Sequence, residues 1–586
     1  MEKSWQSIAA RKQAERASRI PLEWRVKAAV AGDNEDILAL PRKCGILTDR
    51  ELSITESYDA TDLRDELAKG SLKAEDVARA FAKRAAVCQQ AVNCLTEILF
   101  EDALVRAREL DAHFQKTGKP IGPLHGLPIS LKDTFKIKGY DASIGIADLC
   151  FQPAHTNSAL VDLLISQGAV LYCKTNVPQT MMALDSHNNV FGRTINPGNT
   201  KLTAGGSSGG ECALIAMRGS ILGIGTDVGG SIRVPAACNG LYGVKPSHGR
   251  VPFAGQEGGV KAGSSKLGIE PTAGPIATSA RDCALLLQVI SDGVAAERAF
   301  DDPDVIGQRW AQQLPLPNTS SKPLRAGIIR TDGHVQPLPP IIRLMDDVAH
   351  TLRSSSSSRR TSASTIPPVQ VVDVTPLASP ILARALKVFN GLTTLDGAND
   401  WFDLLDKTHE PLSPWLQGRL RRRAPKPLAQ ARALHAQRLE LQSAFLQIWN
   451  AEHLDVLLLP VAPHPIAPID RWNSANYTAA LNLLDLPAGV LPVRACTRLD
   501  LRDELLPPDD SSTPPLNGWD KINRELWTTV DRSVYLDSPL SVQVITPRLT
   551  ERKLVEAMGI LDEALRPLKK KKKEENNDST ARTPKL

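Results

Sequence analysis

The chain has 586 residues and a formal net charge of +5 at pH 7, and 42% of its residues are hydrophobic. This composition supplies ample material for a sizeable aliphatic core. No run of about 18 uncharged apolar residues occurs, so we expect no transmembrane segment. Length alone favours several domains, but no linker separates the middle of the chain from the helices before it. We therefore predict one large domain over residues 61–568.

The positive charge is concentrated at the C-terminal end. Residues 569–586 contain seven Lys or Arg and three acidic residues, a net charge of +4, so the rest of the chain is nearly neutral. A near-neutral body binds nucleic acid poorly, and we predict no nucleic-acid partner. The run Lys569–Lys573 is typical of a solvated, disordered basic tail, with a nuclear localisation or anionic-surface patch as the alternative.

The nine cysteines form no Cys-x-x-Cys pair, and Met1–Ser4 does not begin a signal peptide. We therefore predict reduced thiols in a cytoplasmic protein, with nuclear or peroxisomal targeting as alternatives. The ending Pro584-Lys585-Leu586 is distantly similar to the peroxisomal Ser-Lys-Leu signal. The 11 histidines show no metal-binding spacing, so we predict no metal and no cofactor. Three of them are candidates to line a cleft or to be satisfied loop residues: His187, His248 and His464.

The N-terminal part of the chain is typical of helices. Residues 1–60 are predicted as a helical lead-in, and further helices are expected up to about Gln115, on the outside of a sheet. One stretch places apolar residues at helical spacing, which gives a single apolar face: Val77, Phe81, Ala85 and Cys88.

The tract Gly126–Asp133 carries the first chemical signal. Lys132 ends an apolar stretch in which a lysine would be partly buried, and burial lowers the pKa of an amine toward that of a usable base. The neighbouring Asp133 offers an alternative, because an ion pair between the two side chains would keep Lys132 charged.

Two glycine-rich tracts carry serines. They are Gly205-Gly206-Ser207-Ser208-Gly209-Gly210 and Gly225–Arg233, which contains Ser231. A serine hydroxyl becomes a nucleophile when a neighbour removes its proton, and the oxyanion that then forms needs amide N–H groups that glycine allows to come close. A single such tract is more often a flexible loop. Both tracts together with Lys132 indicate acyl transfer.

Short apolar runs around these tracts predict a buried sheet. Strands are expected at Ala169–Cys173, Ile221–Gly225 and Leu454–Leu459, and a helix at Gly209–Met217. Ser231 is then expected just beyond a strand end, where the backbone turns and exposes its N–H groups.

The lysine tract and the two serine tracts resemble those of the amidase signature family, in the order of that family. Lys132 and Ser207 are 75 residues apart, and Ser207 and Ser231 are 24 apart. The similarity extends through three flanking segments: Lys174–Thr180, Asn189–Pro197 and Gly240–Pro246. Fungal acetamidase-type and general amidases are the most similar group, a judgement that also uses the lead-in around Trp5 and Trp24. The resemblance implies an α/β fold in which helices sandwich a mixed sheet.

The resemblance also implies roles for individual residues. Ser231 corresponds to the nucleophile, Ser207 to the bridging serine and Lys132 to the terminal base, and the peptide bond between Gly206 and Ser207 is expected to be cis. Backbone N–H groups of residues 228–231 are expected to form the oxyanion hole. The full expected set of oxyanion and substrate-binding residues is Val228, Gly229, Gly230, Met181, Thr226, Asp227 and Ser208.

An amide hydrolase acting on a small-molecule amide is the leading hypothesis, and a homodimer is left open. The acyl pocket is expected to include Met181, Met182 and the helices around Trp401 and Trp415, which leaves the acyl size open. One alternative is a component similar to the amidase subunit of a tRNA-dependent amidotransferase, which the tail and insertions argue against. The other is a non-catalytic binding protein, which the presence of all three triad positions argues against.

Two segments are predicted as disordered surface insertions. Residues 353–365 are a low-complexity serine run, and residues 505–517 are rich in Pro, Asp and Ser. The segment Pro539–Ile545 resembles a late strand of the family, but Ser541 stands where glycine is usual, which leaves the local backbone open.

Overall fold

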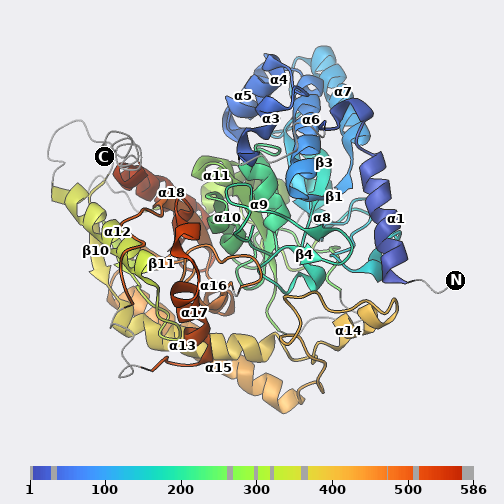
Figure 1. Cartoon of the computed structure of the whole chain (residues 1–586). Coiled ribbons are helices and arrows are strands. Elements are labelled where there is room, and N and C mark those ends of the chain that lie inside the picture. Colours follow the sequence, from blue (N-terminus) through green and yellow to red (C-terminus); the bar gives the residue numbers. More distant parts are fainter. Residues whose placement is uncertain are drawn as a thin grey trace, which may run out of the picture.

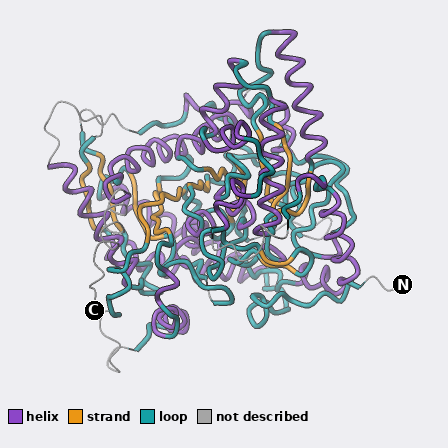
Figure 2. Tube along the Cα trace, turned by 45° about the horizontal axis from the view of Figure 1, so that its top comes forward, coloured by secondary structure: helices purple, strands orange, loops and turns teal. Residues whose placement is uncertain are grey.

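The computed structural model describes residues 4–27, 36–259, 268–295, 301–316, 322–357, 367–471, 473–505 and 514–569. Within these ranges an 11-stranded sheet runs through the molecule, and helices cover both of its faces (Figures 1 and 2). A separate two-stranded ribbon pairs β4 (His187–Asn188) with β5 (Gly192–Arg193).

The order of strands across the large sheet mixes early and late segments of the chain. From one edge to the other they are β1 (Leu95–Ile98), β3 (Val170–Thr175), β2 (Pro128–Lys132), β6 (Leu222–Asp227), β8 (Thr272–Ala277), β7 (Tyr242–Lys245), β12 (Ala488–Ala495), β13 (Pro539–Ile545), β11 (Val456–Pro460), β9 (Leu324–Ile328) and β10 (Val369–Asp373).

The sheet is mixed in direction. Strand β2 is parallel to both neighbours, β3 and β6, whereas the pairs from β6 through β8, β7, β12 and β13 to β11 are antiparallel. Strand β9 is parallel to both of its neighbours, β11 and β10. A mixed sheet between helical layers confirms the predicted α/β class.

Alternating side chains along the strands supply both faces of the core. On β11, Val456 and Leu458 join the core that also holds residues of α12 (Pro339–Ser357) and α18 (Glu551–Ala564). Leu457 and Leu459 join the opposite core, formed with α13 (Thr375–Leu392), α15 (Leu428–Ala451) and α16 (Asn476–Leu483). A strand with apolar residues on both sides must be covered on both faces.

The early helices gather on one side of the sheet, at the top of Figure 1. They are α3 (Leu40–Lys43), α4 (Asp49–Glu56), α5 (Ala60–Lys69), α6 (Ala74–Val92) and α7 (Phe100–Thr117). The predicted apolar face lies on α6, where Val77, Phe81, Ala85 and Cys88 are fully buried, so that prediction is confirmed.

The remaining helices connect the strands or cover the ends of the sheet. They are α1 (Trp5–Ser18), α8 (Ala159–Ser166), α9 (Gly209–Ala216), α10 (Arg233–Cys238), α11 (Ala280–Gly293), α14 (Asn399–Asp406) and α17 (Gly518–Thr528). The predicted helix at Gly209–Met217 is thus confirmed as α9, and the three predicted strands are β3, β6 and β11 with ends shifted by one or two residues. Strand β6 continues to Asp227 because it pairs with Thr272 of β8.

Parts of both predicted insertions are ordered. Residues 353–357 belong to α12, because the helix that begins at Pro339 continues into the serine run. At the second insertion Leu505 is buried, and Asn517 caps α17 by accepting hydrogen bonds from two backbone N–H groups. The predicted disorder was wrong at these edges, and residues 358–366 and 506–513 lie outside the described residues.

Two other local predictions can be compared with the structure. Lys569 does not belong to a disordered tail, because its Nζ atom donates a 2.8 Å hydrogen bond to the Tyr242 hydroxyl and also contacts Asp562. Residues 570–586, including the targeting-like ending, lie outside the described residues. Ser541 lies within the regular strand β13, where a register shift of β12 between Pro492 and Arg494 faces it.

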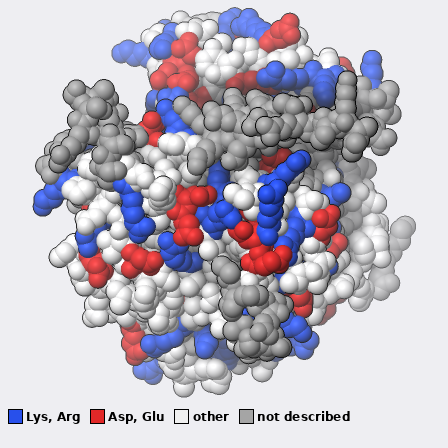
Figure 3. Space-filling model, turned by 60° about the vertical axis from the view of Figure 1, so that its left-hand side comes forward, with Lys and Arg blue, Asp and Glu red and all other residues white. Residues whose placement is uncertain are grey.

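Charged side chains of both signs are interspersed on the face shown in Figure 3. Among the residues that the structure describes, no helix is long and apolar enough to cross a membrane.

Buried charges attach α1 to the body of the protein. Lys12 is 2% exposed, and its Nζ atom lies 2.5 Å from Oε1 of Glu97 and 2.7 Å from Oδ2 of Asp141. Burial alone would lower the pKa of Lys12, but the two carboxylates raise it above its usual value. Removing one member of such a cluster leaves an uncompensated buried charge.

We predict that Lys12→Ala lowers the free energy of unfolding by roughly 3–5 kcal/mol, because Glu97 and Asp141 lose their cation. Chemical denaturation followed by circular dichroism measures this loss. Lys69→Ala is the matched control, since Lys69 forms an exposed pair with Glu66 and its removal is expected to change little. Equal stability of the Lys12 and Lys69 variants would contradict the prediction.

Candidate active site

The three predicted tracts meet at one edge of the sheet. Strand β2 ends at Lys132 and the neighbouring parallel strand β6 ends at Asp227, so the carboxyl ends of both strands lie side by side. Helix α9 begins directly after Ser207 and Ser208. The ends of parallel strands are a common place for functional groups, because loops and helix N-termini converge there.

Lys132 is fully buried and contacts Ser207, which was predicted above to be the bridging serine. Its Nζ atom lies 2.7 Å from Oγ of Ser207, 2.8 Å from Oγ1 of Thr226 and 3.2 Å from the carbonyl oxygen of Thr226. Burial lowers the pKa of Lys132 to about 7, against the opposing effect of nearby anionic groups such as Asp227. A neutral amine fits these partners, since it can donate to both Thr226 oxygens and accept from the Ser207 hydroxyl.

Asp133 does not pair with Lys132, which rules out the alternative of an ion pair between them. Its carboxylate accepts hydrogen bonds from Oγ1 of Thr96 (2.6 Å), Oγ of Ser143 (2.9 Å) and the N–H of Ile144 (2.6 Å). Its cationic neighbour is Lys174, at 3.6 Å. Consecutive residues of an extended chain point to opposite sides, which separates the two side chains.

The double-serine turn is tied to both neighbouring tracts. The peptide bond between Gly206 and Ser207 is cis, as the resemblance implied. The N–H of Ser208 donates to the carbonyl oxygen of Ser231 (3.2 Å), and its hydroxyl lies 3.4 Å from both the backbone N and O of Thr226. Ser208 is therefore a residue that joins the turns rather than one that faces the cavity.

Asp227 holds the turn that presents Ser231. Its carboxylate accepts hydrogen bonds from the N–H of Gly230 (2.7 Å) and of Ile232 (3.1 Å), and from Nε of Arg233 (3.0 Å). Burial would raise the pKa of Asp227, but the Arg233 guanidinium holds it well below the usual range. The carboxylate thus stays ionised and fixes the backbone on both sides of Ser231.

The hydrogen bond between Gly230 and Asp227 removes one N–H group from the expected oxyanion hole of residues 228–231. The Gly230 N–H is already donated to Asp227, so it is not available to a substrate oxygen. Among the described residues, none accepts a hydrogen bond from the N–H groups of Val228, Gly229 or Ser231. These three groups remain as candidate donors.

Arg233 connects Asp227 to segments late in the chain. Its guanidinium donates to Oε1 of Gln543 (2.8 Å) and to Oδ1 of Asn482 (2.5 Å), and Asn482 in turn donates to Asp227 (2.9 Å). The sequence prediction missed Gln543 and Asn482, because residues about 250 to 310 positions away carry no local signal for this contact.

Ser207 and Ser231 lie on the wall of one cavity of about 490 Å³. Of the other predicted site residues, Thr226, Val228 and Met181 also line it, whereas Lys132 lies behind Ser207. Met182 and Trp401 line it as expected, and Trp415 is not among the lining residues. The sequence prediction missed most of the apolar wall: Phe253, Ile269, Pro271, Leu392, Leu395, Pro425, Leu428 and Ala431.

The backbone at Thr180 and Met181 is strained, and the residue before it is anchored by hydrogen bonds. Thr180 and Met181 have φ angles of 65° and 60°, in the left-handed region that side chains with a Cβ disfavour. The preceding Gln179 is anchored, since its amide donates to Oε1 of Glu410 (2.6 Å) and accepts from the N–H of Ser413 (2.8 Å). The anchor keeps this strained segment at the cavity wall.

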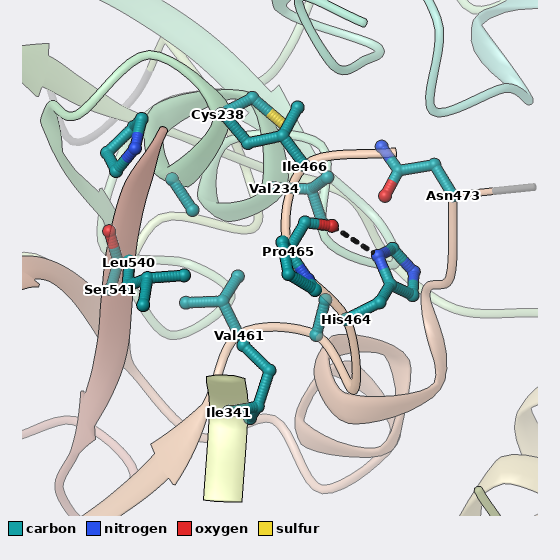
Figure 4. A pocket seen from close by; sticks show the side chains of 13 residues that line it. Val234, Cys238, Ile341, Val461, His464, Pro465, Ile466, Asn473, Leu540 and Ser541 are labelled. Atoms are coloured by element: carbon teal, nitrogen blue, oxygen red, sulfur yellow. Dashed lines mark hydrogen bonds between the residues drawn. The ribbon is translucent and has the colours of Figure 1, made fainter. Parts of the chain in front are cut away.

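The candidate histidines do not line this cavity. His464 lines a small separate pocket, where its Nδ1 donates to the carbonyl oxygen of Pro465 (2.7 Å; Figure 4). Its Nε2 accepts from the N–H of Ser474 (3.1 Å). His187 and His248 are absent from the cavity wall as well. Within the described residues, no cluster of three or more His, Cys, Asp or Glu side chains could hold a metal ion.

Comparison with known proteins agrees with this geometry. The family model described as Amidase matches residues 76–555. An acetamidase of Aspergillus oryzae is 36% identical over 560 residues, covering 94% of this chain and 97% of its own. An acetamidase of Emericella nidulans is 34% identical and covers 96% and 99%. Among solved structures, a fatty acid amide hydrolase superposes with a TM-score of 0.82 at 26% identity, covering 96% of this chain and 95% of its own.

The α/β fold, the cavity wall with Ser207 and Ser231, and these relatives together identify the protein as an amide hydrolase. The chain belongs to the amidase signature family. This result rules out the alternative of a non-catalytic binding protein.

We predict that Gly230→Ala lowers kcat/KM on the order of 100-fold, because it would displace the turn that carries Ser231 and a displacement of about 1 Å in a reacting group has effects of that size. Gly230 has a φ of 131°, and an added Cβ would meet Oγ1 of Thr478. Gly118→Ala is the matched control, since Gly118 also has a positive φ (65°) but open space around its Cβ position. Steady-state amide hydrolysis measures both variants, and equal losses in the two would refute this account of the turn.

Proposed function

We propose that the protein cleaves a linear carboxamide to a carboxylic acid and ammonia or an amine, through an acyl-enzyme on Ser231. One observation carries the proposal: the buried Lys132 Nζ lies 2.7 Å from the Ser207 hydroxyl, and Ser207 shares a cavity wall with Ser231. A buried lysine near its transition between charged and neutral forms is suited to act as a base.

The proposed proton path runs from Ser231 to Ser207 and from Ser207 to Lys132. Ser231 Oγ attacks the amide carbonyl carbon as its proton moves to Ser207, while Ser207 gives its own proton to neutral Lys132. The tetrahedral intermediate collapses with cleavage of the C–N bond, and the proton returns along the same path to the leaving nitrogen. Water then hydrolyses the ester on Ser231 and releases the acid.

Three backbone donors are proposed to hold the oxyanion: the N–H groups of Val228, Gly229 and Ser231. Their freedom from other acceptors among the described residues supports this set. The apolar wall of the cavity favours an apolar acyl group on the substrate. The relatives are named for amides as different in size as acetamide and fatty acid amides, so the names alone do not define the acyl length.

We predict that the purified wild-type protein alone releases ammonia from simple primary amides, and that Ser231→Ala reduces turnover by a factor on the order of a million. The variant lacks the atom that becomes acylated. An ammonia assay over a series from acetamide to long-chain amides measures both. Unchanged hydrolysis in folded Ser231→Ala would refute the mechanism, and activity only with an added partner would favour an amidotransferase component.

We predict that turnover rises with pH through about 7 and then levels off, because Lys132 must be neutral to accept a proton and its pKa is lowered to about 7. Lys132→Arg should lose turnover on the order of 10³-fold and should not regain it at high pH, since arginine does not deprotonate in proteins. The pH dependence of kcat measures both effects.

An exposed lysine supplies the control for this substitution. Lys69→Arg keeps the surface pair with Glu66 and should leave the pH profile unchanged. Wild-type turnover in Lys132→Arg would mean that Lys132 is structural and that the proton path proposed above is wrong.

A further inference from the structure

Glu211 is a buried carboxyl group that the reaction above does not use. It lies in the first turn of α9, four residues after Ser207, and it is fully buried. Its Oε1 contacts Oγ of Ser130 on β2, and its Oε2 accepts a 2.7 Å hydrogen bond from Oγ1 of Thr175 on β3. One side chain therefore connects a helix with two strands.

The two residues that contact Glu211, Ser130 and Thr175, are neighbours of Lys132 in the sheet. Ser130 lies two residues before Lys132 on β2, so both side chains belong to the same face of the sheet. Thr175 is the residue of β3 that pairs with Lys132 in register. Because α9 follows the Ser207 turn, Glu211 links the strand of the lysine to the helix of the serine.

Strand β6, the other neighbour of β2, makes room for the carboxyl group of Glu211. Gly223 of β6 pairs with Ser130, and a Cβ at Gly223 would overlap Oε1 of Glu211. A glycine is therefore needed at this point of β6 because of the close approach of the carboxyl group.

Counting hydroxyl hydrogens indicates the protonation state of Glu211. Ser130 Oγ also lies 2.8 Å from Oγ of Ser220, and Ser220 Oγ lies 3.1 Å from the carbonyl oxygen of Leu222. The carbonyl can only accept, so Ser220 donates to it, and Ser130 then donates to Ser220. Ser130 has a single hydrogen and keeps none for Glu211. The contacts that join Glu211, Ser130, Ser220 and Leu222 are all satisfied when Glu211 itself donates to Ser130. Thr175 Oγ1, which also lies 3.4 Å from the carbonyl oxygen of Leu131, gives its hydrogen to the nearer Oε2 of Glu211.

An ionised Glu211 would leave one of these contacts without a hydrogen. Its contacts with Ser130 and Thr175 would use both of their hydrogens, and the single hydrogen of Ser220 could not serve both Ser130 and Leu222. Complete burial also disfavours the ionised form and raises the pKa of Glu211. The titratable groups that lie close enough to interact with it are Lys132 on β2, Tyr172 and Cys173 on β3, Cys94 before β1 and Cys212 on α9.

We propose that Glu211 is a protonated positioning residue that fixes the strand of Lys132 to the helix of Ser207 without placing a negative charge beside the lysine. An ionised carboxylate at this position would favour the ammonium form of Lys132 and oppose its use as a base. This inference rests on the proposed function for its kinetic consequence, whereas the protonation state can be observed without turnover.

Glutamine is the discriminating substitution, because its amide can donate to Ser130 and accept from Thr175 as a neutral acid does. We expect Glu211→Gln to retain most of the turnover that Glu211→Ala loses, with the alanine variant reduced at least tenfold in kcat at little change in KM. The rise of kcat with pH should have the same midpoint in Glu211→Gln and wild type. A midpoint lower by about one pH unit in Glu211→Gln would overturn the proposal, since it would reveal an ionised Glu211 in the wild type.

Infrared difference spectroscopy at pH 6 tests the proton directly, because burial raises the pKa of Glu211 to about 7, whereas an ordinary glutamate is ionised at pH 6. Wild type minus Glu211→Gln should show a carboxylic-acid C=O band that shifts in D₂O, and Ser231→Ala should retain this band. Glu97→Gln is the control for another buried carboxyl group and should leave the band in place. Absence of the band refutes the proposal even if Glu211→Ala does not fold. Full hydrolysis by Ser231→Ala with the band present would instead refute the proposed function alone.

Discussion

The site depends on burying a lysine without giving it a carboxylate partner. Lys132 is fully buried, and its hydrogen-bond partners in the described chain are one serine hydroxyl and two oxygens of Thr226. Because these partners are neutral and anionic groups such as Asp227 offset the cost of burying the ammonium only in part, the pKa of Lys132 falls to about 7. In our proposal an amine in this state exchanges a proton with Ser207, whereas an ordinary surface lysine is almost fully charged at neutral pH.

The sheet and the polar contacts behind it turn this lysine into part of a site. Parallel strands β2 and β6 bring Lys132 and Asp227 to the same edge, and α9 starts there with the serine turn. Asp227 then orders the turn of Ser231 through backbone N–H groups, and Arg233 holds Asp227. The partners of Arg233 come from segments far along the chain, so the complete fold is needed to hold the turn in place.

Local patterns were sufficient to predict helix α9 and three of the eleven strands of the large sheet, β3, β6 and β11, since each depends on one short tract. The α/β class and the pairing of Lys132 with Ser207 were predicted from the resemblance to a family. Long-range contacts were not predictable in this way. Nothing near Gly230 in the sequence reveals that its N–H is taken by Asp227, because an oxyanion-type turn and an Asp-capped turn use the same residues. The apolar wall around Leu392 and Leu428 is another example, since Leu392 ends α13 and Leu428 begins α15, and these helix ends share a cavity wall with Ser231 only in the folded chain.

Three acidic residues near Lys132 show how a buried base can be kept free of ion pairs. Asp133 points away and is compensated by Lys174 together with backbone and hydroxyl donors. Asp227 remains ionised, but Arg233 neutralises it. Glu211 has no cation in contact among the described residues, and in our proposal its own proton neutralises it. Because each negative charge is compensated locally, the opposing effect of groups such as Asp227 is smaller than the effect of burial, and burial determines the protonation of Lys132.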